Sequence, residues 1–239
     1  MLEAAGSVTV QELKERLKVS ESTVRRDLNE LDEKGLLVKV FGGAVQAEPQ
    51  LNATEEKVSM RLSQNREEKE RIGRYAASLI EPGDFVYLDA GTTTGAMIPF
   101  LEEKDAFYVT NAVSHALLLA EKGFRVTLAG GEVKAATEAI VGNEAYVSLQ
   151  KYNFTKGFFG ANGVSRTFGF TTPDINEAMI KECALRHTRK PYILCDSGKF
   201  HQVSTVTFAA FEDAAVITGR LPKEGFKGAD NLLVAEEEP

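Results

Sequence analysis

Short apolar runs alternate with helical stretches between residues 85 and 218, and this alternation constrains the fold more than any other feature. Runs of strand length cover residues 85–89, 107–110, 125–128, 156–160, 192–195, 205–209 and 215–218. Helical patterns cover residues 66–80, 94–102, 114–122, 142–150 and 174–188. Strands that are apolar along their whole length are buried on both faces. The pattern therefore predicts an α/β unit with a mostly parallel sheet between layers of helices.

Polar residues and glycines follow the predicted strands. Ligands of open parallel sheets bind beyond the carboxyl ends of the strands, so these positions converge by topology. The segment from Asp89 to Gly95 combines hydroxyls with backbone amides in the manner of a phosphate cradle. Read singly, the segment at Asp89 is also consistent with a turn, residues 160–163 with a plain loop, and Lys199 with a surface lysine. Together they predict a site for a small, oxygen-rich anion, made by Asp89, Gly91, Thr92, Thr93, Thr94, Thr110, Asn111, Gly130, Gly131, Asn162, Gly163, Asp196 and Lys199.

One helix start adds two charged candidates to this site. Asp174 follows Pro173 and is placed to cap a helix. Glu177 and Lys181 are four residues apart, so they share a helix face. Two interpretations stay open, a salt bridge within the helix or a pair of side chains at the mouth of the ligand site.

A helix-turn-helix pattern lies near the start of the chain. Thr9 and Glu12 have the spacing of a capping box at the head of one short helix. After a tight turn, Ser20 is placed to cap a second helix with Val24 and Leu28 on one face. Residues 36–45 then predict a small hairpin, or wing. Two short helices joined by a turn, followed by a wing, form a DNA-binding arrangement.

The polar face of the second helix carries side chains that suit DNA. Arginine forks onto guanine or phosphate, asparagine binds adenine, and short hydroxyls bind phosphate. A charged helix face is also an ordinary solvated face, so spacing alone leaves both readings open. The candidate DNA contacts are Ser20, Ser22, Thr23, Arg25, Arg26, Asn29 and Lys39.

Length and composition fit a small module and one larger domain. We expect a DNA-binding domain over residues 1–46, a polar linker over 47–60 and a second domain over 61–239. The net charge of −7 argues against a protein that coats nucleic acid nonspecifically. Cys183 and Cys195 lack the spacing of a redox or zinc pair, so we expect neither metal nor cofactor. With no secretory leader or bilayer-length apolar run, we expect a cytoplasmic protein.

These residues carry a resemblance to the DeoR family of bacterial transcription repressors. Residues 6–46 resemble the family's DNA-binding domain, in particular through the segments 19–28, 35–37 and 42–45. Residues 61–220 resemble its sugar-phosphate sensor domain, a fold similar to ribose-5-phosphate isomerase, glucosamine-6-phosphate deaminase and coenzyme A transferases. The matching points there include Arg61, Asn65, Lys69, Asp89, Thr110, Gly130, Gly160 and Lys199.

The resemblance implies a repressor of a sugar-utilisation operon. Its partners would be operator DNA, a phosphorylated sugar and further copies of itself, as a dimer or tetramer that meets paired half-sites. Residues 169–181 are most similar to the fructose-operon repressors, which implies fructose 1-phosphate as the ligand. The alternative is a sugar-phosphate isomerase or deaminase with Glu177 as its base. Family members usually carry about one more helix ahead of this point, and residues 1–6 match only the tail of such a helix. If the helix is missing, we expect Leu13 and Leu17 to be exposed.

Overall fold

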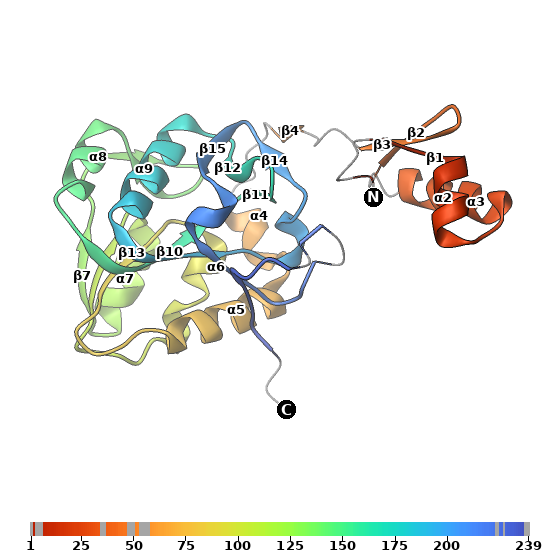
Figure 1. Cartoon of the computed structure of the whole chain (residues 1–239). Coiled ribbons are helices and arrows are strands. Elements are labelled where there is room, and N and C mark those ends of the chain that lie inside the picture. The colour runs from red at the N-terminus through yellow and green to blue at the C-terminus, as the bar shows by residue number, and fades with distance from the viewer. Residues whose placement is uncertain are drawn as a thin grey trace. The chain divides into compact units, whose positions relative to one another are not determined.

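The computed structural model describes residues 2, 7–33, 37–46, 51–52, 58–222, 225–226 and 228–236. The chain divides into two compact units, Met1–Gln50 and Leu51–Pro239, which are described separately below (Figure 1). Among the described residues, no helix has the length and apolar character needed to cross a membrane.

The first unit is a winged helix-turn-helix, which confirms the predicted class of the head. Its three-stranded antiparallel sheet has the order β1-β3-β2. The sequence reading missed β1, which pairs with β3. The elements are β1 (Ser7–Thr9), α2 (Val10–Leu17), α3 (Glu21–Glu33), β2 (Leu37–Val40) and β3 (Gly43–Gln46).

Packing and capping together hold this small unit. The predicted capping box is present, because the Glu12 amide donates to the Thr9 hydroxyl (3.2 Å) and the Thr9 amide donates to the Glu12 carboxylate (2.8 Å). A helix as short as α2 is marginal alone, so its stability depends on the core. Leu17 is 57% exposed, as expected, whereas Leu13 packs partly against that core. The buried residues are Val8, Val10, Val24, Leu28, Leu37 and Ala44.

The second unit is built on a seven-stranded sheet in which every pairing is parallel. This confirms the predicted α/β class. The strand order is β17-β16-β13-β10-β5-β6-β7. The strands are β5 (Phe85–Leu88), β6 (Phe107–Thr110), β7 (Arg125–Leu128), β10 (Phe154–Gly160), β13 (Thr188–Leu194), β16 (Ala215–Thr218) and β17 (Leu232–Val234).

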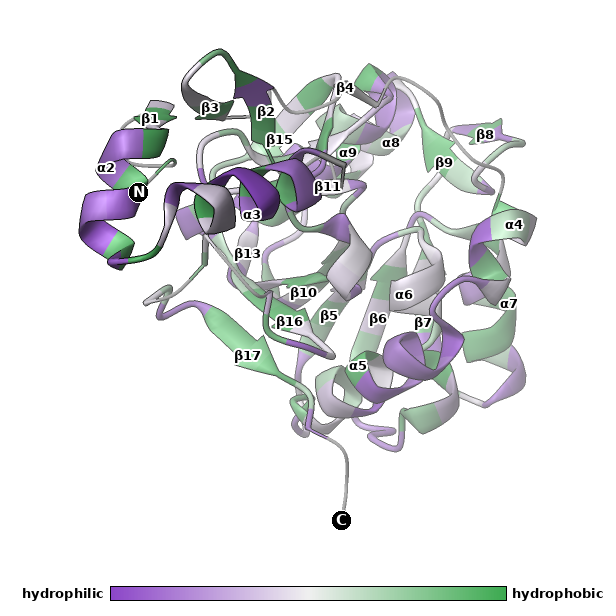
Figure 2. Cartoon of the chain, turned by 90° about the vertical axis from the view of Figure 1, so that its right-hand side faces the viewer, coloured by the Kyte–Doolittle hydropathy of each residue, from purple (hydrophilic) through white to green (hydrophobic). Residues whose placement is uncertain are grey.

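Both faces of this sheet are buried. Tyr87 and Phe159 point into one core, under α8 (Asn143–Leu149) and α9 (Ile175–Arg186). Leu88 and Phe158 point into the other, under α5 (Arg66–Ser78), α6 (Thr92–Gly95), η1 (Ile98–Phe100) and α7 (Val113–Glu121). Figure 2 shows the hydrophobic strands β5, β6 and β16 and the hydrophilic surface of α3. Burial on both faces explains why these strands read as continuous apolar runs.

Two predicted elements differ in the structure. The helix expected over residues 94–102 is split into α6 and η1, with Pro99 in the first turn of η1. The strand expected over 205–209 is β15 (Val206–Ala209), which lies outside the main sheet. It forms an antiparallel sheet with β11 (Gly163–Ser165) and β12 (Gly169–Thr172). Thr207 is exposed, whereas Phe208 and Ala209 are buried.

The predicted linker over residues 47–60 contains regular structure. β4 (Leu51–Asn52) pairs in parallel with β14 (Val203–Ser204). Residues 58–60 open the helix α4 (Val58–Ser63), so α4 begins inside the stretch that the sequence assigns to the linker. Residues 47–50 and 53–57 lie outside the described residues. A separate hairpin, β8 (Glu132–Lys134) and β9 (Ala139–Val141), follows the edge strand β7.

Candidate functional site

The strand order places a topological switch point between β5 and β10. From β5 the chain proceeds to β6 and β7 on one side, and then to β10 and β13 on the other. Neighbouring loops part at such a point, which leaves a crevice beyond the strand ends. A cavity of about 40 Å³ lies there, between the loop after β5 and the loop after β10. Its lining residues are Arg61, Gln64, Lys69, Ala90, Gly91, Thr92, Thr93, Thr137, Gly160, Ala161, Asn162, Glu177, Lys181, Asp196 and Lys199.

A buried ion pair lies at the cavity, with Lys181 in its lining and Asp89 directly behind it. The Lys181 ammonium donates to Asp89 Oδ2, which also accepts from the Gly160 amide at 3.0 Å. Burial raises the pKa of Asp89 above its usual range, although Lys181 acts in the opposite direction. Asp89 Oδ1 is buried and has no hydrogen-bond partner among the described residues.

The loop after β5 is fixed from beneath. The Thr94 hydroxyl donates to the carbonyl of Asp89 (2.7 Å) and to that of Gly91 (2.9 Å). Asn111, at the end of β6, accepts from the Ala90 amide at 2.9 Å. These contacts position Gly91, Thr92 and Thr93, which line the cavity. Thr94 and Asn111 are not part of the lining.

His115 of α7 supports the same loop. Its ring is buried, and burial lowers its pKa to about 4, although a hydrogen bond to the Gly91 backbone acts in the opposite direction. The imidazole is therefore neutral near neutral pH. Gly95 lies directly against it, because an added Cβ at that position would be 2.7 Å from the ring Nε2. The glycine is needed there for close approach.

The start of α9 brings a carboxylate to the cavity wall. Asp174 caps the helix by accepting from the Glu177 amide at 2.9 Å. Glu177 accepts from the Thr137 hydroxyl (2.6 Å) and from Lys134 (3.3 Å), and Lys134 also pairs with Asp174 (3.0 Å). Lys181 binds Asp89 instead. Both members of the predicted Glu177 and Lys181 pair thus line the cavity and are held by different partners.

Three further cations reach the cavity from outside the sheet. Arg61 comes from α4, Lys69 from α5 and Lys199 from η2 (Ser197–Lys199). The Lys69 ammonium donates to the Arg61 carbonyl at 2.6 Å, which ties α4 to α5. On the η2 side, Asp196 Oδ1 accepts from Asn65 Nδ2 at 2.7 Å. The cavity lining is therefore rich in cations, which suits an anion.

The structure gathers part of the predicted ligand set. Asp89, Thr94 and Asn111 lie one layer behind the cavity wall. Those that line it are Gly91, Thr92, Thr93, Asn162, Glu177, Lys181, Asp196 and Lys199.

Four predicted ligand residues lie away from the cavity, which corrects the prediction for them. Thr110 is fully buried, and its hydroxyl accepts from the Ala112 amide at 3.0 Å. Gly130 and Gly131 follow the edge strand β7, and Gly131 packs against the backbone of β9. Gly163 starts β11 and approaches the carbonyl of the residue before β14. The strand-end rule holds for the strands flanking the switch point, and β7 is two strands away.

Other lining residues were absent from the predicted set. Arg61, Gln64 and Lys69 precede the first strand of the sheet, so a search of strand ends does not find them. Arg61 and Lys69 are nevertheless among the residues that carry the family resemblance. Thr137 comes from the turn of the β8–β9 hairpin, whose position depends on tertiary contacts.

The polar face of α3 is exposed in the first unit. Arg25 pairs with Glu21 (2.7 Å) and Arg26 with Asp27 (3.2 Å). Exposed pairs of this kind are worth about 0–1 kcal/mol, so they exchange readily for phosphate or base contacts. Ser22 and Asn29 are exposed on the same helix, which leaves this face accessible to DNA within its own unit.

The predicted DNA contacts at the two ends of α3 also have structural partners. The Ser20 hydroxyl accepts from the Thr23 amide at 3.2 Å, so it caps the helix as expected. At the other end, the Lys39 ammonium donates to Asn29 and the Lys39 amide donates to Asp32 (2.9 Å). Asn29 and Lys39 therefore join the wing to the recognition helix.

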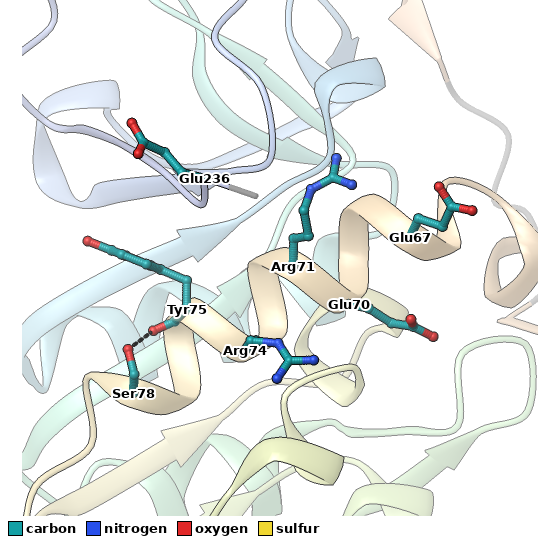
Figure 3. A pocket seen from close by; sticks show the side chains of 7 residues that line it. All are labelled: Glu67, Glu70, Arg71, Arg74, Tyr75, Ser78 and Glu236. Atoms are coloured by element: carbon teal, nitrogen blue, oxygen red, sulfur yellow. Dashed lines mark hydrogen bonds between the residues drawn. The ribbon is translucent and has the colours of Figure 1, made fainter. Parts of the chain in front are cut away.

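A second, larger hollow of about 560 Å³ lies on the outer side of α5 (Figure 3). It is lined by Glu67, Glu70, Arg71, Arg74, Tyr75, Ser78 and Glu236. Most of these side chains are exposed, and carboxylates and guanidinium groups are mixed along it. Because this mixture selects neither sign of charge, we take the smaller cavity at the switch point as the candidate ligand site.

A winged helix-turn-helix joined to a parallel α/β unit with a polar cavity defines a class, the ligand-responsive DNA-binding regulators. Comparison with known families agrees. A DeoR-like helix-turn-helix domain matches residues 1–50, and a DeoR C-terminal sensor domain matches residues 64–220. The chain belongs to the DeoR family.

Individual relatives are similar over most of their length. An uncharacterized HTH-type transcriptional regulator of Bacillus subtilis, FruR, is 43% identical, covering 91% of this chain and 86% of its own. A lactose phosphotransferase system repressor of Staphylococcus epidermidis is 36% identical, covering 89% and 86%. Among solved structures, ribose 5-phosphate isomerase A of Methanocaldococcus jannaschii aligns with 57% of this chain and 55% of its own, at 16% identity and a TM-score of 0.42.

Proposed function

We propose that this protein represses a sugar-utilisation operon and that a phosphorylated sugar, fructose 1-phosphate, binds at the switch-point cavity and weakens its hold on operator DNA. The observation that carries the proposal is the charge arrangement of the cavity. Arg61, Lys69 and Lys199 line it together with Glu177, Asp196 and Asn162. The names of the similar FruR regulator and lactose repressor support a sugar operon.

The cationic side chains of the cavity suit the phosphate group of the ligand, and its carboxylate and amide side chains suit the sugar hydroxyls. A phosphate group carries nearly two charges at neutral pH and binds several cationic donors at once. Arg61, Lys69 and Lys199 line the cavity and are the cationic donors that we assign to the phosphate, whereas Lys181 pairs with Asp89. Sugar hydroxyls donate to carboxylate and amide oxygens such as those at Glu177 and Asn162.

The head would act in pairs. A recognition helix covers one half-site, and operators are pseudo-palindromic because two heads bind them at fixed separation. We therefore propose a homodimer or tetramer acting in the cytoplasm, where the DNA is. In each head Arg25 and Arg26 would meet the major groove and Lys39 the phosphate backbone. Ligand switches such a protein only if it binds the DNA-competent and incompetent states unequally.

Ligand binding can be tested without DNA. A sugar phosphate that binds only the folded state at a hundred times its Kd stabilises it by about 2.7 kcal/mol, which a thermal-shift panel detects. Lys199→Met removes a charged donor worth about 1.5–3 kcal/mol, so we expect the affinity to fall at least about tenfold. Lys151→Met, at an exposed lysine outside the cavity, is the control. Equal affinity in both variants would contradict the assigned site.

An isomerase or deaminase would need a carboxylate free to take a proton from the sugar. Asp89, Glu177 and Asp196 each accept hydrogen bonds from neighbouring protein groups. No observation in this cavity favours the enzyme over the regulator. Turnover of ribose, fructose or glucosamine phosphates by the purified protein would overturn this choice.

A further inference from the structure

The chain segment that follows the head forms part of the cavity wall. α4 starts at Val58 and contributes Arg61 to the cavity lining. Gln64, the residue after the end of α4, also lines the cavity. This helix has only six residues and no fully buried side chain. A helix of that length is unstable alone, so the contacts it makes decide its position. It packs against α6, the helix of the loop after β5 (Figure 1).

Hydrogen bonds among the described residues join both ends of α4 to the rest of its unit. The Val58 amide donates to the Ala136 carbonyl at 3.2 Å, in the turn between β8 and β9. The Lys69 ammonium donates to the Arg61 carbonyl at 2.6 Å. The first bond therefore joins the beginning of α4 to the tip of the hairpin.

The same hairpin tip contacts the ligand site. Thr137, next to Ala136, lines the cavity and donates its hydroxyl to Glu177 at 2.6 Å. The base of the hairpin is held differently, since the Ile140 amide donates to the Asn111 carbonyl at 2.6 Å, at the end of β6. The hairpin thus has a base fixed on the main sheet and a tip tied to Glu177 and α4.

The cavity is smaller than a sugar phosphate, so part of its wall must move when the ligand binds. A buried water needs about 10–15 Å³ on this scale, so 40 Å³ holds about three waters. A sugar phosphate is several times larger. The loops after β5 and β10 lead directly from strands of the main sheet, whereas the hairpin and α4 are joined to their surroundings through hydrogen bonds and, at Lys134, through ion pairs with Asp174 and Glu177. Admission of the ligand should therefore displace the hairpin tip and α4.

We propose that the Val58–Ala136 hydrogen bond couples the ligand cavity to the DNA-binding head. A ligand hydroxyl at Glu177 competes with Thr137 and moves the hairpin tip. The tip carries Ala136 with it, and so shifts the start of α4. In sequence β4, which pairs with β14, lies between the head and α4, so the shift reaches the head by way of β4. This inference rests on the proposed function and adds a route by which the ligand acts.

Val58→Pro tests the bond with little other change. Proline has no amide hydrogen, so the donor to Ala136 disappears, and proline is favoured at the first position of a helix. Val58→Ala is the matched control, because it shortens the side chain and keeps the amide. We expect fructose 1-phosphate to raise the melting temperature of both full-length variants by the same amount. The ligand-induced loss of operator affinity should be about fivefold smaller in Val58→Pro, the change equivalent to one net hydrogen bond of about 1 kcal/mol.

The outcomes separate the two claims. The coupling is overturned if fructose 1-phosphate lowers the operator affinity of Val58→Pro as much as that of Val58→Ala while it raises both melting temperatures equally. Absence of any melting shift in the wild type overturns the proposed ligand, and the coupling with it. Hydrogen exchange of the wild-type Val58 amide gives a second reading that needs no variant. The amide should stay protected when fructose 1-phosphate is added, because an intact bond carries α4 with the hairpin, and loss of protection contradicts the coupling.

Discussion

Acidification should destabilise the second unit through His115. Its pKa is about 4 in the folded protein because the ring is buried, against 6.5 for a free histidine. The folded pKa is lower, so as the pH falls below 6.5 the unfolded chain takes up a proton that the folded chain refuses. Stability is therefore lost as the pH falls from about 6.5 to about 4. At 1.36 kcal/mol per pKa unit, the loss is about 3 kcal/mol.

A matched variant isolates this effect from all other titrating groups. His115→Gln has no proton to gain in this range, while every carboxylate of the protein stays the same. Urea unfolding of both proteins at several pH values gives the free energy of unfolding of each. We expect the wild type to lose about 3 kcal/mol more than His115→Gln between about pH 7 and pH 4. Parallel loss in the two proteins would refute the assignment of a buried neutral imidazole.

Three further outcomes follow from the packing. Gly95→Ala places a methyl group 2.7 Å from a ring nitrogen and should cost about 1–3 kcal/mol in urea unfolding, whereas Gly130→Ala, with nothing within 4 Å, should cost less than about 0.5 kcal/mol. Phe41 is fully exposed at the tip of the wing, and the chain has no tryptophan, so Phe41→Trp gives a single fluorophore whose emission should change on adding operator. An unchanged spectrum would place the wing tip away from DNA. Lys156→Met leaves Asp84 buried without its 2.7 Å partner and should cost about 3–5 kcal/mol by chemical denaturation, while the surviving folded protein keeps its ligand affinity.

The parallel sheet could be predicted because burial on both faces leaves a direct mark on composition. Phe158 and Phe159 point to opposite cores, so both must be apolar, and the same holds along the central strands. β17 was missed because its short, half-buried run carries no such mark. The strand-end rule identified Gly91, Asn162 and Lys199, because loops at a switch point converge whatever their sequence.

The remaining site residues depend on contacts between distant segments. Thr137 reaches the cavity because a hairpin folds back onto α9, and its bond to Glu177 spans forty positions of sequence. Arg61 reaches it from a short helix in a stretch that composition marks as linker. Thr110 has a suitable residue type at a strand end, yet its hydroxyl accepts a hydrogen bond from the Ala112 amide. Residue type and spacing do not distinguish these cases.

Operator binding as a function of ligand tests the central claim most directly. A DNA fragment selected from random sequences by the full-length protein serves as operator, and fructose 1-phosphate is titrated into the complex in a gel shift. We predict release of the fragment by the wild type and retention by Lys199→Met at the same concentration, with Lys151→Met behaving as wild type. A wild-type complex that ignores fructose 1-phosphate and every other phosphosugar, while still binding its fragment, would contradict the account.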